Sequence, residues 1–206
     1  MPRLAREGWL GMVINWGRRE VNVKIVYYGP PLSGKTTNLI QIHGHIDPHR
    51  RGELISLKTP DDRTLYFDFL RLDLAKIGGM RPRIYLYTVP GQSLYEASRR
   101  LVLRGADGLV FVADSSLARV EGNMDSLASM RGHLRSFALS PDRLPLVVQF
   151  NKRDLPDAVP AAELGRMLEL SGIPTFEAVA VQGIGVYDTL KAIIHDVIVH
   201  LQREFT

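Results

Sequence analysis

The chain of 206 residues is 45% hydrophobic and 23% charged, and it carries a formal charge of +4. These proportions exclude a disordered or membrane-embedded chain, and the length favours one domain with a full hydrophobic core. The sequence contains no cysteine, which excludes disulfide bonds, thiolate metal sites and cysteine-linked lipid anchors.

The positive charge comes mainly from arginine and favours a solvated basic face over nucleic-acid binding, because no aromatic residues are interleaved with the basic ones. The apolar run at residues 9–14 is too short for a signal peptide and lacks a small-residue cleavage site. We therefore expect a cytoplasmic protein with no nucleic-acid partner. Residues 1–16 are expected to be an N-terminal extension or leading segment, and residues 17–206 a single domain.

A phosphate-binding motif follows the first predicted strand. Residues 21–28 are β-branched and aromatic and predict that strand, and residues 29–36, GPPLSGKT, match the pattern G-x-x-x-x-G-K-[ST] before a predicted helix at 37–42. In such a loop, backbone N–H groups and the helix dipole bind phosphates. We expect Lys35 to bridge the β- and γ-phosphates of a nucleotide, and the Thr36 hydroxyl to ligate its Mg²⁺.

The rest of the chain predicts an alternating architecture. Residues 43–63 are polar and are expected to be a mobile connection, and strands at 64–70 and 83–89 predict an antiparallel pair. Helices are then predicted at 93–103, 119–137, 161–170 and 186–203, and strands at 108–114, 145–150 and 175–179. These repeated units predict an α/β fold of the P-loop NTPase kind: a mostly parallel six-stranded sheet with one antiparallel edge pair and helices on both faces.

A second motif, NKRD at residues 151–154, directly follows an apolar strand. Ligands of open parallel sheets bind at the carboxyl ends of the strands. There Asp154 can accept hydrogen bonds from N1–H and the 2-amino group of guanine, a pair of donors that adenine lacks. Asn151 is expected to brace the loop and approach the base, and the Lys152 stem to cover one ring face. Together with the phosphate loop, this motif predicts guanine.

The segment TVPGQ at residues 88–92 comes between these motifs, at the end of a predicted strand. The backbone N–H of Gly91 is placed to sense the γ-phosphate, and Gln92 to orient an attacking water, because phosphoryl transfer depends mainly on positioning and charge. From these residues alone, an ordinary Pro-Gly turn remains the alternative.

Taken together, these segments resemble the Ras-like small GTPases, and within them the bacterial MglA type associated with gliding motility and cell polarity. The resemblance covers nearly all of the chain from about residue 12. It rests on residues 24–30, 32–38, 62–65, 87–92 and 151–156.

The resemblance implies a Ras-like G domain that binds GTP and GDP with Mg²⁺. It implies that Thr64 is a metal ligand in the GTP state and that Arg63 acts as an arginine finger from the same chain. It also implies a roadblock-fold activating protein of the MglB kind and polarity or motility effectors. Any recruitment to the cell pole or the inner membrane face would then go through partners.

The predicted site residues form three groups. The predicted catalytic residues are Gln92 and Arg63, the metal ligands are Thr36 and Thr64, and the nucleotide-binding residues are Gly29, Leu32, Ser33, Gly34, Lys35, Thr36, Thr37, Gly91, Asn151, Lys152, Asp154 and Ala180.

Three departures from the family pattern qualify these expectations. Thr88 stands where Ras-like proteins generally have the aspartate of D-x-x-G, so Mg²⁺ is expected to lose a nearby charge. Residues 179–181 replace the S-A-K loop, which leaves the Ala180 N–H as the expected contact with the guanine O6. Pro31 stands where close relatives usually have glycine, and its ring is expected to crowd Gln92 or the attacking water.

The sequence therefore predicts a GTP-driven molecular switch that hydrolyses GTP slowly without an activating partner and binds effectors in the GTP state. The alternative, suggested by Pro31, is a slowly hydrolysing GTP-bound scaffold that docks its partners constitutively. An ATP-dependent kinase or transport ATPase is disfavoured by the segments at 88–92 and 151–154.

Overall fold

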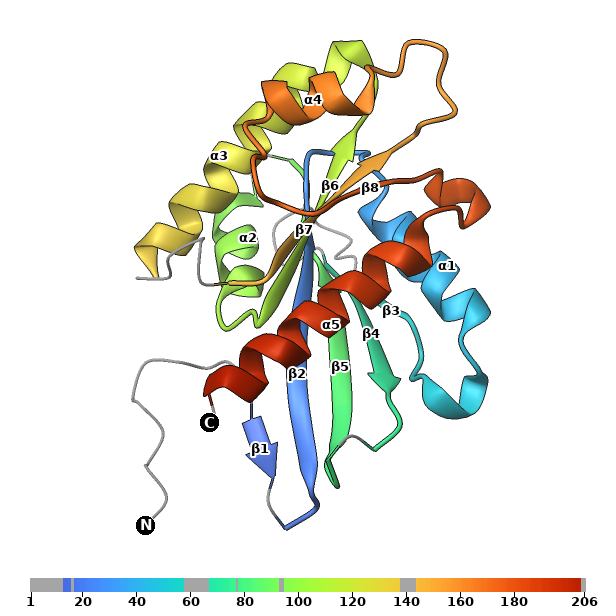
Figure 1. The fold of residues 1–206 in the computed structure, drawn as a ribbon, viewed down its shortest axis with the longest axis vertical. Helices are drawn as coiled ribbons and strands as arrows, with labels where there is room; N and C mark the ends of the chain where they lie inside the picture. The colour runs from blue at the N-terminus through green and yellow to red at the C-terminus, as the bar shows by residue number, and fades with distance from the viewer. Residues whose placement is uncertain are drawn as a thin grey trace.

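The strand that precedes the phosphate loop, β2 (Glu20–Tyr28), lies in the middle of a mixed sheet (Figure 1). The computed structural model describes residues 13–15, 17–57, 67–76, 78–92, 95–137 and 144–204. The other strands are β1 (Val13–Asn15), β3 (Ile55–Leu57), β4 (Phe67–Asp73), β5 (Arg81–Thr88), β6 (Gly108–Asp114), β7 (Leu146–Asn151) and β8 (Thr175–Glu177). The α-helices are α1 (Lys35–His45), α2 (Glu96–Leu103), α3 (Val120–Ser136), α4 (Ala161–Met167) and α5 (Val186–Glu204). Short 3₁₀ helices are η1 (Pro48–Arg50), η3 (Leu117–Arg119) and η5 (Ala180–Gln182).

The sheet confirms the predicted α/β class. Its strand order is β3-β4-β5-β2-β6-β7-β8, and β1 pairs with β2 outside this path. Strands β5, β2, β6, β7 and β8 run parallel, and β4 and β5 form the predicted antiparallel pair. The neighbouring antiparallel pairs β3–β4 and β1–β2 were not predicted.

The strand count is a correction, because the described sheet has eight strands instead of six. The two additional strands, β1 and β3, have three residues each. β1 lies in the segment expected to be a leading segment, and β3 lies in the expected mobile connection. Strands this short show no clear periodicity, so only their pairing with β2 and β4 defines them.

Helices cover both faces of the sheet and create two apolar layers. Figure 1 shows α1 and α5 in front of the sheet and α2 and α3 behind it. On the front face, α5 buries Val186, Leu190, Ile193 and Val197, which form an apolar stripe at helical spacing. β6 is buried along its whole length, as expected for a central parallel strand between two helical layers. Among the described residues, no helix is long and apolar enough to cross a membrane.

Candidate functional site

The sequence motifs meet at one edge of the sheet. Tyr27 of β2 pairs with Thr88 of β5, and Asp114 of β6 pairs with Asn151 of β7, so the carboxyl ends of these parallel strands lie at one edge of the sheet. The phosphate loop therefore lies beside both the 88–92 segment and the NKRD segment. This is the edge at which open α/β sheets bind their ligands.

The phosphate loop is closely packed against the NKRD segment at Gly34. The backbone of Gly34 has φ +102°, a left-handed conformation that favours glycine. A Cβ atom at this position would lie 2.2 Å from Nδ2 of Asn151. The first turn of α1 begins at the next residue, so the helix N-terminus faces the loop. This geometry explains why the second glycine of the motif is needed here.

Lys35 is folded back onto its own loop. Its Nζ donates hydrogen bonds to the carbonyl oxygens of Gly29 and Pro30, at 2.9 and 2.7 Å. The side chain is buried, and this burial lowers the pKa of Lys35 to about 7, with the positive charge of Arg99 acting in the same direction. A phosphate group would offer this ammonium a full negative charge in exchange for two neutral carbonyl oxygens.

Asn151 joins the phosphate loop to the loop after β8. Its Nδ2 donates to the carbonyl oxygen of Ser33, and its Oδ1 accepts from the backbone N–H of Ala180, both at 2.8 Å. The side chain is buried, with 3% exposed, so both bonds are shielded from water. The Ala180 N–H therefore already donates a hydrogen bond to Asn151. Its predicted bond to the guanine O6 stays a prediction, and it requires Ala180 to share this N–H between the two acceptors or to release Asn151.

The other residues of the NKRD segment have different roles. Lys152, whose φ is +65°, donates from Nζ to Oδ2 of buried Asp114 at 2.6 Å, which fixes the direction of its stem. Arg153 donates from Nε to Oε2 of Glu177 at 2.7 Å, which ties the segment to β8. Asp154 is exposed, and no hydrogen bond or ion pair to its carboxylate is found within the described part of the chain. Of these three side chains, Asp154 is the one left free for a ligand.

A buried polar triangle under the site was not found by sequence reasoning. Gln149 donates from Nε2 to Oδ1 of Asn38 and to Oγ1 of Thr189, both at 3.0 Å, and it accepts from Nδ2 of Asn38 at 2.8 Å. All three residues are completely buried. The triangle connects α1, β7 and α5. It therefore fixes the helix of the phosphate loop against the strand that carries NKRD.

Asp68 of β4 supplies a carboxylate beside Thr36. Its Oδ2 accepts from the hydroxyls of Thr36 and Thr88, at 2.5 and 2.8 Å, and its Oδ1 accepts from the Ser56 hydroxyl at 2.7 Å. Hydroxyl and carboxylate oxygens are the hard ligands that Mg²⁺ prefers. Contrary to the expectation drawn from Thr88, this position has a negative charge nearby.

Sequence reasoning missed Asp68, although a signal was present. In β4, Asp68 is in phase with Leu70 and Leu72, and all three are buried, whereas Phe67 and Phe69 are in the other phase. A carboxylate on the buried side of an alternating strand costs free energy unless it is paired, so its presence indicates a partner or a metal.

A cavity of about 650 Å³ opens beside Asp68 and Thr36. At one wall, Gly91 lies directly against the phosphate loop: a Cβ on Gly91 would lie 2.5 Å from the backbone N and Cα of Pro31. Gln92 is exposed and also lines the cavity, and the residue that lies against Pro31 is its neighbour Gly91. The lining residues are Pro31, Leu32, Lys35, Thr36, Ile40, Ser56, Phe67, Asp68, Thr88, Val89, Pro90, Gly91, Gln92 and Tyr95.

Two predicted residues, Arg63 and Thr64, lie outside the described residues. Leu32 is 76% exposed at the tip of the phosphate loop, and Thr37 is half-buried in the first turn of α1. The structure therefore brings the phosphate-loop, Gly91, Gln92, NKRD and Ala180 positions to one edge of the sheet.

Comparisons with known proteins agree with this arrangement. Over 190 residues the chain is 51% identical to the mutual gliding-motility protein MglA of Myxococcus xanthus, and the alignment covers 92% of this chain and 97% of that protein. It is 34% identical over 116 residues to ADP-ribosylation factor-like protein 4D of Bos taurus, covering 55% of this chain and 56% of that protein. It is 25% identical over 167 residues to ADP-ribosylation factor-like protein 2 of Arabidopsis thaliana, covering 81% and 79%. No protein-family model matches the chain.

A phosphate loop after β2, an N-K-x-D segment after β7 and the mixed sheet that holds them define a Ras-like small GTPase domain. Proteins of this class bind guanine nucleotides with Mg²⁺ and hydrolyse GTP. Within the class, the chain belongs to the MglA family, as the long alignment with the Myxococcus protein shows.

Proposed function

We propose that the chain is a GTP-driven switch whose GTP-bound form binds effectors that control cell polarity or gliding-type motility. The observation that carries the proposal is the pair of hydrogen bonds from Asn151 to Ser33 and Ala180. These bonds hold the phosphate loop and the base-side loop together. Asp154, exposed at the same edge, gives this site its specificity for guanine.

In the proposed complex, the carboxylate of Asp154 accepts hydrogen bonds from N1–H and the 2-amino group of guanine. The Lys152 stem, directed by its ion pair with Asp114, lies along one face of the ring. The phosphates bind to the backbone N–H groups of residues 33–36 at the N-terminus of α1. Lys35 then exchanges its bonds with the Gly29 and Pro30 carbonyl oxygens for bonds with the β- and γ-phosphates.

The residues around Thr36 fit a magnesium site. We assign Thr36 as a residue that would hold the metal and Asp68 as the neighbouring carboxylate that would supply negative charge beside it, with Thr64 as the further ligand expected in the GTP state. When bound, Mg²⁺ neutralises charge that develops on the β- and γ-phosphates. Thr88 holds the Asp68 carboxylate in place through its hydroxyl, so a threonine at this position supports the charge that an aspartate supplies in other Ras-like proteins.

For hydrolysis, the proposal assigns Gln92 to the attacking water and Arg63 to the charge on the transferring phosphoryl group. Gln92 lies on the cavity wall near Thr36 and Asp68. Arg63 is four residues before Phe67, which lines the same cavity. A roadblock-fold activating protein, similar to MglB, would bring both side chains into place, and hydrolysis without it is expected to be slow.

A second candidate function is a GTP-bound scaffold that docks its partners constitutively. The contact between Pro31 and Gly91 favours this alternative, because a proline ring stands beside the backbone that is expected to sense the γ-phosphate. A segment that cannot move away from Pro31 would not respond to hydrolysis.

The guanine assignment is tested by competition. In this assay a fluorescent GDP analogue is bound to the purified protein, and GDP, GTP or ATP is then titrated in as a competitor. We expect GDP and GTP to compete at concentrations at least about a hundredfold below ATP, because two hydrogen bonds to Asp154 are lost with adenine. Equal competition by ATP contradicts the assignment.

Single-turnover hydrolysis, with and without a roadblock-fold partner, separates the switch from the scaffold. The switch predicts strong stimulation that is lost in Arg63→Ala and in Gln92→Leu, with losses of about 10³-fold or more for the arginine. Arg119→Ala, which removes an exposed arginine from the start of α3, is the matched control and should keep full stimulation. No stimulation of the unmodified protein favours the scaffold.

A further inference from the structure

A second hollow lies at the end of the sheet opposite the nucleotide site. It has a volume of about 460 Å³ and is lined by η1, the end of β4 with the loop after it, and the start of β5. β2, which pairs with β5, has nine residues, and a strand rises ~3.3 Å per residue, so its two ends lie about 26 Å apart. The hollow is therefore well separated from the phosphate loop.

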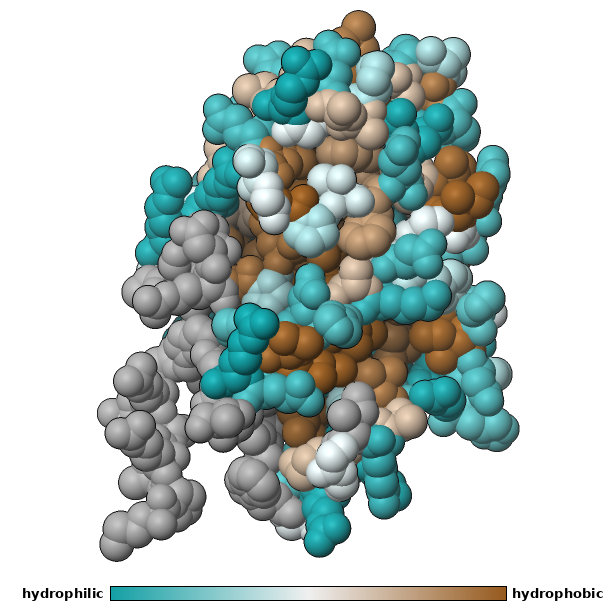
Figure 2. Space-filling view, viewed as in Figure 1, coloured by the Kyte–Doolittle hydropathy of each residue, from teal (hydrophilic) through white to brown (hydrophobic). Residues whose placement is uncertain are grey.

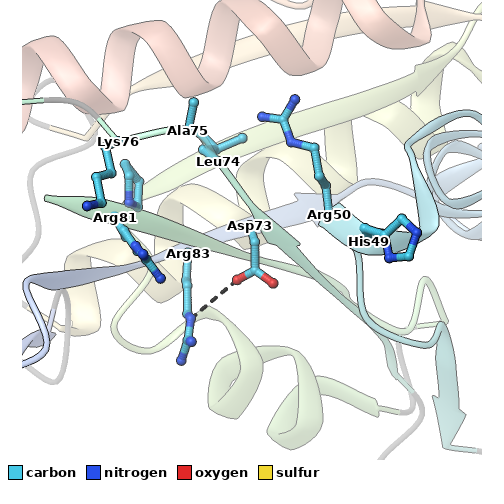
Figure 3. A pocket seen from close by; sticks show the side chains of 9 residues that line it. His49, Arg50, Asp73, Leu74, Ala75, Lys76, Arg81 and Arg83 are labelled. Atoms are coloured by element: carbon cyan, nitrogen blue, oxygen red, sulfur yellow. Dashed lines mark ion pairs between the residues drawn. The ribbon is translucent and has the colours of Figure 1, made fainter.

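Basic side chains dominate this hollow. Figure 3 shows His49 and Arg50 on one side of it and Lys76 and Arg81 on the other. Asp73 is the one acidic residue among the lining side chains. The walls therefore carry a clear excess of positive charge.

The acidic groups next to the hollow are already paired. Asp73 Oδ1 lies 3.3 Å from Nε of Arg83, and its Oδ2 lies 3.4 Å from Arg71. Glu20 at the start of β2 lies 3.0 Å from Arg83. Two carboxylates are thus shared by two arginines, and they leave little negative charge for the remaining cations.

The remaining cations face solvent. Arg50, Lys76 and Arg81 are exposed, and no ion pair with any of them is found among the residues that the structure describes. The backbone N–H of Arg81 donates to the carbonyl oxygen of Arg19 at 2.7 Å, so the arginines of the β1–β2 turn border the same end of the sheet. Figure 2 shows hydrophilic residues at this tip of the molecule. Like charges held together without partners repel one another, and an anionic ligand relieves that repulsion.

The shape and lining of the hollow distinguish three kinds of anionic ligand: a phosphate ion, a membrane surface and an acidic peptide. The lining also contains the apolar residues Leu74, Ala75 and Pro82, and none of the three unpaired cations is buried. A single phosphate ion needs donors that converge on one point, whereas these cations are spread over three segments. A flat membrane cannot enter a concave surface, and the large apolar side chains that are exposed in the described chain lie elsewhere. A peptide segment with several carboxylates along an extended backbone matches cations that are spread over three segments and an apolar part of the lining.

We infer that this hollow is a docking site for an acidic segment of a partner protein. The segment places one carboxylate beside Arg81 and Lys76 and another beside Arg50, while its backbone and small side chains cover the apolar lining residues. Such a contact gives electrostatic specificity and fast association. It uses neither the phosphate loop nor the 88–92 segment, so it is a second partner surface alongside the nucleotide-dependent one.

The test is fluorescence anisotropy with a labelled short peptide of alternating glutamate and alanine, and with the same peptide carrying glutamine in place of glutamate. The purified full chain is compared with a hollow variant, Lys76→Glu with Arg81→Glu, and with a control variant, Arg119→Glu with Arg135→Glu. Both variants change the net charge equally, and the control residues are exposed at the two ends of α3. Thermal unfolding of each variant checks that the fold is kept.

We expect the glutamate peptide to bind the unmodified chain and the control variant within about twofold, and the hollow variant at least about tenfold more weakly. The glutamine peptide should not bind. Equal weakening in both variants, or binding of the glutamine peptide, overturns the inference. Sedimentation with phosphatidylglycerol vesicles is measured in parallel, and vesicle binding that depends on Lys76 and Arg81 without peptide binding assigns the hollow to a lipid surface instead.

Discussion

The base side and the metal side of the nucleotide site are built in opposite ways. On the base side, Asn151 already bonds to the phosphate loop and to the Ala180 loop, and its partners are backbone groups. On the metal side, Thr36 bonds to the Asp68 carboxylate and Lys35 to the carbonyl oxygens of its own loop, through the same atoms that are proposed to bind Mg²⁺ and the phosphates. In the proposed complex the base side keeps its hydrogen bonds, whereas the metal side exchanges partners.

This difference separates recognition from switching. Groups that need no rearrangement contribute affinity for guanine in both the GDP and the GTP state. Groups that change partners respond to the γ-phosphate and to Mg²⁺, which are what distinguishes the two states. Substitutions on the base side should therefore alter binding of every guanine nucleotide, and substitutions on the metal side should alter the response to the metal and hydrolysis.

The largest expected effect is that of Asp154→Ala on affinity. Two charge-assisted hydrogen bonds to guanine are lost, each contributing ~1.5–3 kcal/mol, so affinity for GDP should fall by about 10²–10⁴-fold. Titration with a fluorescent GDP analogue measures this. Thermal stability without nucleotide should be unchanged, because this carboxylate is exposed. If the variant binds GDP within threefold of the affinity of the unmodified protein, Asp154 does not contact the guanine base.

Asn151→Ala should affect both folding and binding. It leaves the Ala180 N–H and the Ser33 carbonyl without their buried partner, and each unsatisfied buried group costs ~1–3 kcal/mol. Urea unfolding without nucleotide should show a loss of a few kcal/mol, in contrast to Asp154→Ala. A variant that loses affinity while keeping full stability would show that the brace is unimportant for the fold.

Asp68→Asn tests the metal side. The amide keeps the shape of the side chain but removes its charge, so the stabilising effect of Mg²⁺ on bound nucleotide should fall by about tenfold to a hundredfold. The rate of GDP release is measured with Mg²⁺ and after its removal by EDTA. In the unmodified protein EDTA should accelerate release strongly, and in the variant only weakly. An undiminished response to EDTA would exclude Asp68 from the metal site.

The smallest expected effect is that of Pro31→Gly. Removing the ring frees the contact with Gly91, and single-turnover hydrolysis should rise a few-fold, to about two to five times the original rate. GDP affinity should stay within about twofold, since the N–H donors of residues 33–36 are untouched. An unchanged hydrolysis rate means that Pro31 does not restrain the 88–92 segment.

Strong local patterns carried most of the sequence-based prediction of the fold. β6 was predicted with its observed bounds, and α5 within one residue, because a continuous apolar strand and a long apolar stripe each have an unambiguous period. The phosphate loop and NKRD were placed at one edge because parallel strands end together. Motif spacing and strand direction are sufficient to predict that these two motifs lie close together.

Interactions between distant segments could not be predicted in this way. Asp68 and Thr36 are 32 positions apart, and Asn38 and Gln149 are 111 positions apart, so no local period connects either pair. The hydrogen bond from the Ala180 N–H to Asn151 could not be predicted either, because almost every residue has a backbone N–H and the residue type does not show which one is used. β1 and β3 were missed because pairing, and not composition, defines strands of three residues.

The polar triangle of Asn38, Gln149 and Thr189 limits how this domain can be recombined with others. Gln149 bonds to both Asn38 and Thr189, and all three side chains are fully buried. Replacing Gln149 by an apolar residue removes a buried hydrogen-bond partner from both Asn38 and Thr189, whereas replacing all three together removes the need for these bonds. A chimera that imports the phosphate-loop helix from another GTPase must therefore also import matching residues in β7 and α5, although neither of these residues is part of a nucleotide motif.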